Sequence, residues 1–175
     1  MSGLKRTVAL VGMMGAGKSS LGRRLAAKLD VEFRDADSEI ETAAGCSINE
    51  IFDRFGEPAF RDGESKVIAR LLSMPPHVLA TGGGAFAVEK TRERIKAGAV
   101  TVWIKVPLEV LVERVGRRDT RPLLRKGDPR EILERLLKER EPIYAQADMT
   151  VDSEDGPHNA AVARIVESLR ERGLV

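Results

Sequence analysis

The sequence has few of the features that mark secreted, membrane-bound or nucleic-acid-binding proteins. It holds one cysteine, Cys46, so no disulfide can form within the chain, and we expect a reducing cytoplasm as its compartment. No window approaches the ~20 apolar residues of a membrane span, and no apolar stretch resembling a signal peptide precedes the first predicted strand. The 29 Lys and Arg residues nearly balance the 27 Asp and Glu residues, which argues against nucleic acid or a membrane surface as the main partner.

Strand-like and helix-like patterns alternate along the chain. Short apolar runs predict strands at Val8–Val11, Val31–Arg34, Val78–Thr81, Val100–Ile104 and Met149–Val151. Helical patterns fill the intervals, and 175 residues with 42% hydrophobic content are enough for a single domain over residues 1–175. This alternation predicts a three-layer α/β/α fold, in which helices cover both faces of a parallel sheet and ligands bind at the carboxyl ends of its strands.

Capping and proline signals predict where several helices begin. Ser47-Ile48-Asn49-Glu50 is a capping box, and it predicts a short helix that continues through Phe52. Pro58 suits the first turn of a second helix, which should end before the Pro75-Pro76 pair.

The most specific motif follows the first predicted strand. Residues 12–19 read Gly-Met-Met-Gly-Ala-Gly-Lys-Ser and fit G-x-x-x-x-G-K-[ST], the phosphate-binding loop, between a strand and a helix as the motif requires. Its glycines let the backbone approach a polyphosphate, while loop N–H groups and the helix N-terminus point at anionic oxygens. Lys18 is the predicted contact to the β- and γ-phosphates, and Ser19 is a predicted Mg²⁺ ligand. The predicted nucleotide-binding residues of this stretch are Gly12, Met13, Met14, Gly15, Ala16, Gly17, Lys18, Ser19 and Ser20.

Two carboxylates follow the second predicted strand. Asp35 and Asp37 should lie near the phosphate-binding loop, because the carboxyl ends of parallel strands meet at one edge of a sheet. Phosphoryl transfer needs a carboxylate to hold Mg²⁺ and a group to orient or deprotonate the attacking hydroxyl, and Asp-Ala-Asp can supply both. The structural alternative is that Asp37 caps the helix that begins near Ser38.

Two further loops contain glycine or basic residues. Gly82-Gly83-Gly84 follows the third predicted strand, either because a ligand or another backbone comes close there or because the turn is flexible. Residues 116–130 are basic and contain Gly and Pro, and a charge run of this kind is usually a solvated face. Beside a phosphate-binding loop, we interpret residues 114–128 as a lid that excludes water and adds positive charge to the transferring phosphoryl group.

The remaining polar residues give weaker signals. Arg61 and Arg140 are candidates to hold a substrate carboxylate, although the usual fate of such residues is surface charge. We assign no catalytic role to His77 or His158, which sit beside prolines in predicted turns, and we interpret Cys46 as part of a helix-end turn.

Taken together, these motifs resemble the shikimate kinase family. The resemblance is carried by Gly12–Ser19 with Leu21-Gly22-Arg23, Asp35-Ala36-Asp37, Phe60-Arg61 with Glu64, Gly82-Gly83-Gly84-Ala85, and Arg121-Pro122-Leu123-Leu124 with Arg140-Glu141-Pro142-Ile143-Tyr144. The resemblance implies a nucleoside-monophosphate-kinase-like fold with sheet order 2-3-1-4-5. It also implies transfer of a phosphoryl group from ATP to the 3-hydroxyl of shikimate, a step of chorismate and aromatic amino-acid biosynthesis.

The resemblance further implies a role for individual residues. The implied catalytic residues are Lys18, Asp37 as the candidate base, and Arg121 as the lid arginine that reaches phosphate. Arg61 and Arg140 would hold the shikimate carboxylate, and Arg114 would lie near the adenine. The implied substrate-binding residues are Asp37, Arg61, Gly82, Gly83, Gly84 and Arg140, with Phe52 and Phe60 as apolar walls. Ser19 and Asp35 would hold Mg²⁺, the latter through water.

One departure and two alternatives accompany this interpretation. Val78–Thr81 lacks the aspartate that phosphate-loop proteins usually carry at this point, which leaves Asp35 as the metal carboxylate. A gluconate kinase of the same architecture is the alternative enzyme, because shikimate and gluconate are both carboxylated polyols. A non-catalytic nucleotide-dependent switch is the alternative of another class. We expect a cytoplasmic monomer whose partners are ATP and shikimate.

Overall fold

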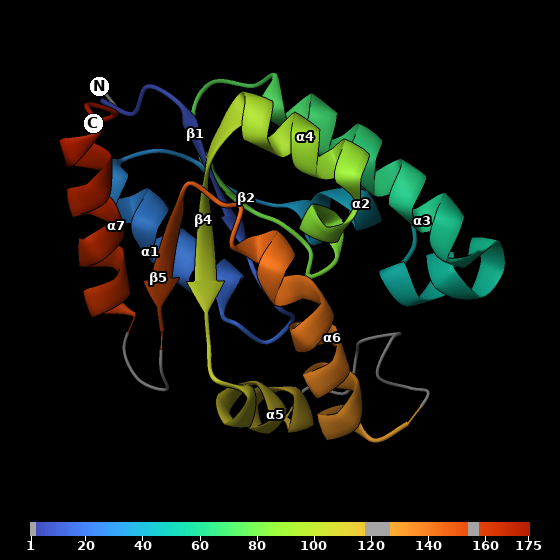
Figure 1. Ribbon diagram of the computed structural model, residues 1–175. Coiled ribbons are helices and arrows are strands. Elements are labelled where there is room, and N and C mark those ends of the chain that lie inside the picture. Colours follow the sequence, from blue (N-terminus) through green and yellow to red (C-terminus); the bar gives the residue numbers. More distant parts are fainter. Residues whose placement is uncertain (1–2, 118–126, 154–157) are drawn as a thin grey trace.

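A parallel sheet with helices on both faces forms the protein (Figure 1). The computed structural model describes residues 3–117, 127–153 and 158–175. The elements are β1 (Thr7–Val11), α1 (Lys18–Leu29), β2 (Phe33–Asp35), α2 (Ala36–Ala44), α3 (Ile48–Leu72), β3 (Val78–Ala80), the 3-10 helix η1 (Ala85–Ala87), α4 (Glu89–Gly98), β4 (Ala99–Lys105), α5 (Leu108–Gly116), α6 (Pro129–Tyr144), β5 (Met149–Asp152) and α7 (Asn159–Glu171). The sheet order β2-β3-β1-β4-β5 confirms the predicted fold class.

The centre of the sheet is buried on both faces. Every residue of β1 is buried, and β4 is buried up to Ile104. Helix α1 packs with α7 on one side of the sheet, and α3 packs with α4 on the other (Figure 1). Strands covered on both faces carry continuous apolar runs rather than alternating ones, which is why β1 and β4 can be recognised in the sequence.

The parallel register brings three loops to one edge of the sheet. Ala80 at the end of β3 pairs with Leu10 of β1 on one side and with Asp35 of β2 on the other. The chain segments that follow these strands therefore leave the sheet next to one another. They are the phosphate-binding loop, the turn that contains Asp37, and the Gly82–Gly84 turn.

The turn after β2 corrects one sequence-based alternative. Asp35, rather than Asp37, caps α2, because its carboxylate accepts a hydrogen bond from the backbone N–H of Ser38 at 3.2 Å. Asp37 lies in the first turn of α2. Its side chain lines the cavities described below.

Helix α3 consists of two helical segments, as the capping and proline signals predict. The Ser47 hydroxyl accepts a hydrogen bond from the backbone N–H of Glu50 at 3.1 Å and so caps the first segment. Gly56 breaks the helix with a φ of 83° and a ψ of 170°, a conformation that L side chains rarely adopt. The second segment follows near Pro58 and carries Arg61.

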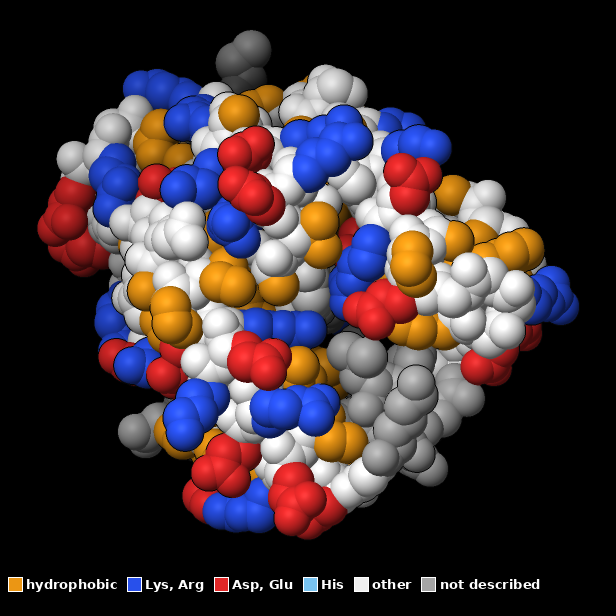
Figure 2. Space-filling view, turned by 45° about the vertical axis from the view of Figure 1, so that its right-hand side comes forward, with side chains coloured by type: hydrophobic (Ala, Val, Ile, Leu, Met, Phe, Trp, Pro, Cys, Tyr) orange, Lys and Arg blue, Asp and Glu red, His pale blue; other side chains and the backbone are white. Residues whose placement is uncertain are grey.

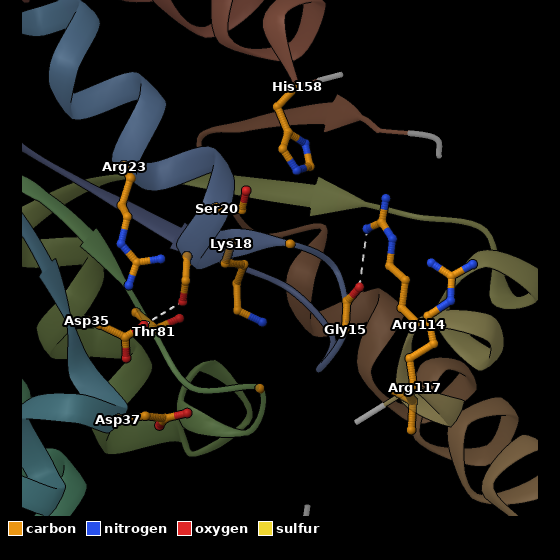
Figure 3. A pocket seen from close by; sticks show the side chains of 14 residues that line it. Gly15, Lys18, Ser20, Arg23, Asp35, Asp37, Thr81, Arg114, Arg117 and His158 are labelled. Atoms are coloured by element: carbon orange, nitrogen blue, oxygen red, sulfur yellow. Dashed lines mark hydrogen bonds between the residues drawn. The ribbon is translucent and has the colours of Figure 1, made fainter. Parts of the chain in front are cut away.

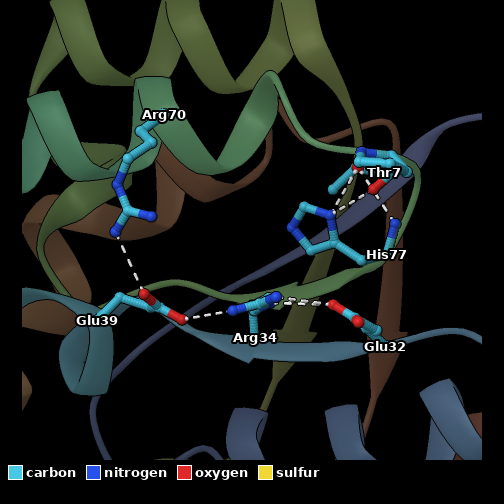
Figure 4. A network of polar contacts seen from close by, with 7 residues as sticks. Thr7, Glu32, Arg34, Glu39, Arg70 and His77 are labelled. Carbon is cyan, nitrogen blue, oxygen red and sulfur yellow. Dashed lines mark hydrogen bonds and ion pairs between the residues drawn. The ribbon is translucent and has the colours of Figure 1, made fainter. Parts of the chain in front are cut away.

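Ion pairs connect β2, α2 and α3 at the edge of the sheet (Figure 4). Arg34 donates to Glu32 at 2.8 Å and to Glu39 at 3.1 Å, and Arg70 of α3 reaches the second oxygen of Glu39 at 3.2 Å. The hydrogen bond from Arg34 is the main cause of the lowered pKa of Glu39. Because most of these side chains are partly exposed, each pair contributes at most about 1 kcal/mol to stability. The network mainly fixes the position of α2 over the sheet edge.

His77 lies at the amino end of the sheet, opposite the edge where the three loops leave the strands. Its ring Nδ1 is 2.9 Å from the carbonyl oxygen of Pro75 and 3.4 Å from the Thr7 hydroxyl, at the start of β1 (Figure 4). The ring is buried, and these contacts give it a structural place at the amino end of the sheet.

Charged side chains of both signs are interspersed over the face shown in Figure 2. Within the described ranges, no helix combines the length and the apolar character that crossing a membrane requires.

Candidate active site

The phosphate-binding loop joins β1 to α1 and lies against two neighbouring elements. A Cβ atom at Gly12 would come within 2.8 Å of the Ile104 carbonyl oxygen in β4, so the loop approaches the sheet too closely for a side chain. Gly17, the N-cap of α1, has a φ of 87°. The Lys18 amine donates to the carbonyl oxygens of Gly12 and Met13 at 2.6 and 2.8 Å, and the side chain is largely buried. The loop therefore holds a cation at its centre.

A cavity of about 380 Å³ opens over this loop (Figure 3). Among the predicted residues that line it are Lys18, Ser19, Asp35, Asp37 and Arg114. The cavity is also lined by Arg23, Thr81, Val115, Arg117 and His158; Arg23 belongs to the motifs that carry the family resemblance, and Val115 and Arg117 belong to the predicted lid. Four of these five side chains are polar or basic, so the cavity suits a polyanionic ligand.

Ser19 and Asp35 form a hard-oxygen pair at one side of the cavity. The Ser19 hydroxyl donates to Oδ2 of Asp35, and the other carboxylate oxygen holds the helix cap. A hydroxyl and a carboxylate are the ligand types that Mg²⁺ prefers, and this ion usually keeps several waters and substrate phosphates in its shell. The donor set therefore fits the predicted metal. Among the described residues, no cluster of three or more His, Cys, Asp or Glu side chains offers a fuller protein cage.

Thr81 stands at the point where phosphate-loop proteins usually carry an aspartate. Its hydroxyl donates to the carbonyl oxygen of Leu10 at 2.8 Å, and it also lines the cavity. The absent carboxylate is thus replaced by a side chain that ties the end of β3 to β1. Asp35 remains the nearest carboxylate to Ser19 among the residues that line the cavity.

Arg114 borders the opposite side of the cavity. It projects from α5 and donates from Nη1 to the carbonyl oxygens of Gly15 and Ala16 at 3.2 and 3.1 Å. These bonds tie α5 to the phosphate-binding loop. Figure 3 shows Arg114 and His158 on one side of Lys18, and Asp35 and Asp37 on the other.

A smaller pocket of about 50 Å³ adjoins the main cavity. Asp37 and Gly83 line both spaces, so the two pockets lie on either side of these residues. Phe52 and Phe60 form an apolar wall, with their ring centroids 4.8 Å apart. The pocket also receives Arg61, so it combines an apolar wall, a carboxylate and a guanidinium group.

The three consecutive glycines have a steric reason in the structure. A Cβ at Gly82 would lie 2.8 Å from Asp37 Oδ1, and one at Gly84 would lie 2.3 Å from Arg61 Nη2. At Gly83 it would lie 3.0 Å from the backbone nitrogen of Met14. The glycines therefore let polar side chains and the phosphate-binding loop approach the backbone. Of the two sequence-based explanations, the structure favours close approach over a merely flexible turn.

Arg61 and Glu64 form a nearly buried ion pair at the pocket. Arg61 Nη1 lies 2.8 Å from Glu64 Oε1, and the Glu64 side chain is only 1% exposed. Burial raises the pKa of Glu64, while the charges of Arg61 and Arg140 oppose this shift and that of Asp37 adds to it. Within the described part of the chain, Glu64 Oε2 has no hydrogen-bond partner. The pair fixes the guanidinium plane of Arg61 beside Gly84.

Arg140 and Tyr144 approach the same glycine turn from α6. Arg140 Nη1 donates to the Gly83 carbonyl at 3.1 Å, and the Tyr144 hydroxyl donates to the same oxygen at 2.5 Å. Both side chains are buried, and burial raises the pKa of the Tyr144 phenol. Tyr144 was not predicted as a site residue. Its position four residues after Arg140 places both on one face of the helix, a signal that the sequence does contain.

One predicted residue lies outside the described ranges. Arg121 belongs to residues 118–126, which the structure does not describe, so the central part of the predicted lid at 114–128 cannot be compared with it. Arg114 and Arg117, from the described start of that segment, both line the main cavity.

The fold and these contacts define a class of protein. The parallel sheet carries a phosphate-binding loop after β1 and a Ser–Asp pair beside that loop. The smaller pocket adjoins them, and we call it the acceptor pocket because it has room for a group that accepts a phosphoryl group. These are the parts of a phosphate-loop kinase that acts on a small molecule.

Comparisons with known proteins give the particular family. The family model described as shikimate kinase matches residues 14–170. The shikimate kinase of Paramagnetospirillum magneticum is 60% identical over 94% of this chain and 84% of that protein. That of Caulobacter vibrioides is 57% identical over 95% of this chain and 83% of that protein. The chain belongs to the shikimate kinase family.

Solved structures agree with this family. The shikimate kinase from Acinetobacter baumannii in complex with shikimate superimposes with a TM-score of 0.93 and 38% identity, over 97% of this chain and 96% of that one. A gluconokinase from Sinorhizobium meliloti superimposes with a TM-score of 0.60 at 20% identity, over 97% of this chain and 98% of that one. The second likeness shows the shared fold alone.

Proposed function

We propose that this chain transfers the γ-phosphoryl group of ATP to the 3-hydroxyl of shikimate, with the roles of individual residues given below. The observation that carries the proposal is that the two pockets adjoin each other and share Asp37 and Gly83 in their linings. A hydroxyl group in the smaller pocket would face a phosphoryl group in the larger one. Such positioning accounts for much of the catalysis in phosphoryl transfer.

On the phosphate side, Lys18 contacts the β- and γ-phosphates. The loop already holds its amine at two backbone carbonyls, so little reordering is needed for the amine to meet phosphate oxygens. Ser19 and Asp35 would hold Mg²⁺, which supplies positive charge to the phosphate oxygens when bound. Arg121 would add a further positive charge from the lid.

On the acceptor side, Arg61 and Arg140 hold the shikimate carboxylate by charge-assisted hydrogen bonds. The buried Glu64 keeps Arg61 in place, and the Gly83 carbonyl keeps Arg140 in place. Asp37 accepts a hydrogen bond from the attacking hydroxyl and is the candidate to take its proton. Phe52 and Phe60 cover the apolar edge of the ring.

The proposal extends to the whole chain. Residues 1–175 form one kinase domain, with residues 114–128 as its lid, acting as a cytoplasmic monomer with ATP and shikimate as its partners. The lining of the main cavity by Arg114 and Arg117 supports the lid assignment.

A coupled ADP-release assay with shikimate and gluconate side by side tests the function. We expect turnover with shikimate and little or none with gluconate. Turnover driven by gluconate would instead indicate the alternative enzyme. If neither shikimate nor gluconate drives ADP release, the result would favour a nucleotide-dependent switch.

Replacing Arg140 by Ala should weaken shikimate binding by about 10- to 150-fold and leave ATP binding nearly unchanged, because one charge-assisted contact is lost. Titration calorimetry of each ligand measures both effects. Tyr144→Phe is the matched control: it removes the other bond to the Gly83 carbonyl but keeps the guanidinium, so its effect on shikimate should be smaller. If Arg140→Ala weakens ATP and shikimate equally, the carboxylate role is wrong.

Arg61 needs a different substitution for the same test. Removing its charge would leave Glu64 buried without its ion-pair partner, which destabilises the fold. Arg61→Lys keeps the charge and loses the bidentate geometry, so we expect weaker shikimate binding in a folded protein.

Replacing Arg121 by Ala should lower kcat by about 10- to 100-fold with little change in the Kd of shikimate, because the lost contact is to the phosphoryl group. Steady-state kinetics and equilibrium binding separate the two quantities. Arg130→Ala is the control, since Arg130 pairs with Glu109 on the surface and lines neither pocket. Equal kcat values for the two variants would contradict the role of Arg121.

A further inference from the structure

His158 is a cavity residue that the proposed mechanism does not use. It immediately precedes α7, and its imidazole points into the main cavity (Figure 3). Its Cε1 atom lies 3.1 Å from the place that a Cβ on Gly17 would occupy, so the ring packs against the end of the phosphate-binding loop. His158 is the N-cap of α7 but forms no side-chain capping bond. Among the described residues, its buried Nδ1 has no hydrogen-bond partner.

The position of His158 determines which part of a nucleotide it would meet. Asp37 and Gly83 line both the main cavity and the smaller pocket, so a γ-phosphoryl group transferred to an acceptor in that pocket must lie at this end of the cavity. The nucleoside end must then lie on the other side of Lys18, where Figure 3 shows His158 and Arg114. The imidazole is therefore placed beside the α-phosphate and the nucleoside rather than at the transferring group.

The surroundings of His158 favour a neutral ring before a nucleotide binds. Partial burial lowers its pKa, and the positive charges of Arg114 on α5 and Arg24 on α1 lower it further. Lys18 and Arg117 add positive charge within the same cavity. Glu154 and Asp155, which precede it in the sequence, lie outside the described residues. A bound polyphosphate reverses this balance, because nearby negative charge favours the protonated imidazole.

We propose that His158 binds the adenine nucleotide and takes up a proton as it does so, which makes nucleotide affinity rise as the pH falls. This inference rests on the proposed function of the main cavity as the nucleotide site. No bond to the nucleotide is made or broken; one proton moves from solvent to the ring. The gain in affinity is fully present below the pKa of the free protein and is lost as the pH rises through the pKa of the complex.

Proton NMR tests the proton uptake directly, because the chain contains only two histidines. The ring signals of His77 and His158 are followed from pH 5 to 8.5, without ligand and with saturating ADP, and the signal absent from His158→Gln identifies the residue. We expect ADP to raise the midpoint of His158 by about 0.5 to 1 pH unit and to leave His77 unmoved. An unmoved His158 with ADP bound would overturn the inference alone. Failure of ADP to bind at any pH would overturn the proposed function as well.

Binding of ADP to His158→Gln provides a second measurement. The Kd should rise by about 3- to 10-fold at pH 6 and by less than about 2-fold at pH 8.5, because only the protonated ring contributes the charge. The titration of the ADP phosphates affects the Kd of both proteins equally, so it cancels in the ratio of the two Kd values. The Kd of shikimate should not change. An equal loss at both pH values, or a parallel loss of shikimate affinity, would contradict the proposal.

Discussion

Replacing Lys18 by Met should lower kcat by about 10²-fold or more while the protein stays folded. The amine is the cation at the centre of the phosphate-binding loop, held by the carbonyl oxygens of Gly12 and Met13. Methionine keeps a similar apolar stem, so the packing of this largely buried side chain is retained while the charge is lost. Charge developing on the transferring phosphoryl group would then lose one preorganised donor.

Lys28→Met is the matched control for this prediction. Lys28 lies in the last turn of the same helix and is exposed, so the same chemical change there should leave kcat nearly unchanged. Circular dichroism and thermal melting of both variants establish that they fold. A folded Lys18→Met protein with near-normal turnover would refute the role of the loop in transfer.

The sequence predicts the phosphate side of the site well because its signals are local. Strand, glycine loop and helix follow one another within residues 7–29, and the structure has them in that order. The positions of Asp35 and Asp37 were also predictable, because parallel strands end at one edge of the sheet whatever their exact bounds. The second strand runs over Phe33–Asp35 instead of the predicted Val31–Arg34, and this shift does not move the turn.

The acceptor pocket was less predictable because it is built from distant segments. Arg61 on α3 meets Gly84, and Arg140 on α6 meets Gly83, across separations that no periodic pattern encodes. The family resemblance, rather than spacing, brought these residues together. The buried state of Glu64 likewise depends on the packing of α3 against the glycine turn, and a helical Glu is normally exposed.

His158 is a second site residue that local sequence signals could not identify. A histidine beside a proline in a turn is an ordinary loop residue by its sequence alone. Its relevance comes from α7, which lies at the far end of the chain but packs beside α1 in the fold. The contact with Gly17 therefore joins segments that are separated by most of the sequence.

Replacing Asp37 by Asn should lower kcat by about 10²- to 10⁴-fold, the usual contribution of a positioned general base. Asp37 lines both pockets from the first turn of α2 and approaches the backbone of Gly82, so its carboxylate stands where acceptor and phosphoryl group would meet. Asparagine keeps the size and one acceptor oxygen but cannot take a proton. Single-turnover kinetics measure the chemical step apart from product release.

The companion measurements separate a base from a group that only orients the hydroxyl. If Asp37 takes the proton, log kcat of the native protein falls at acidic pH as the carboxylate is protonated, and this acidic limb disappears in Asp37→Asn. Asp62→Asn on α3 is the control, because Asp62 pairs with Lys66 at the surface and lines neither pocket, so both rate and profile should stay intact. A kcat of Asp37→Asn within about 3-fold of the native value would exclude the role of general base, since loss of a positioned base is expected to cost far more than that.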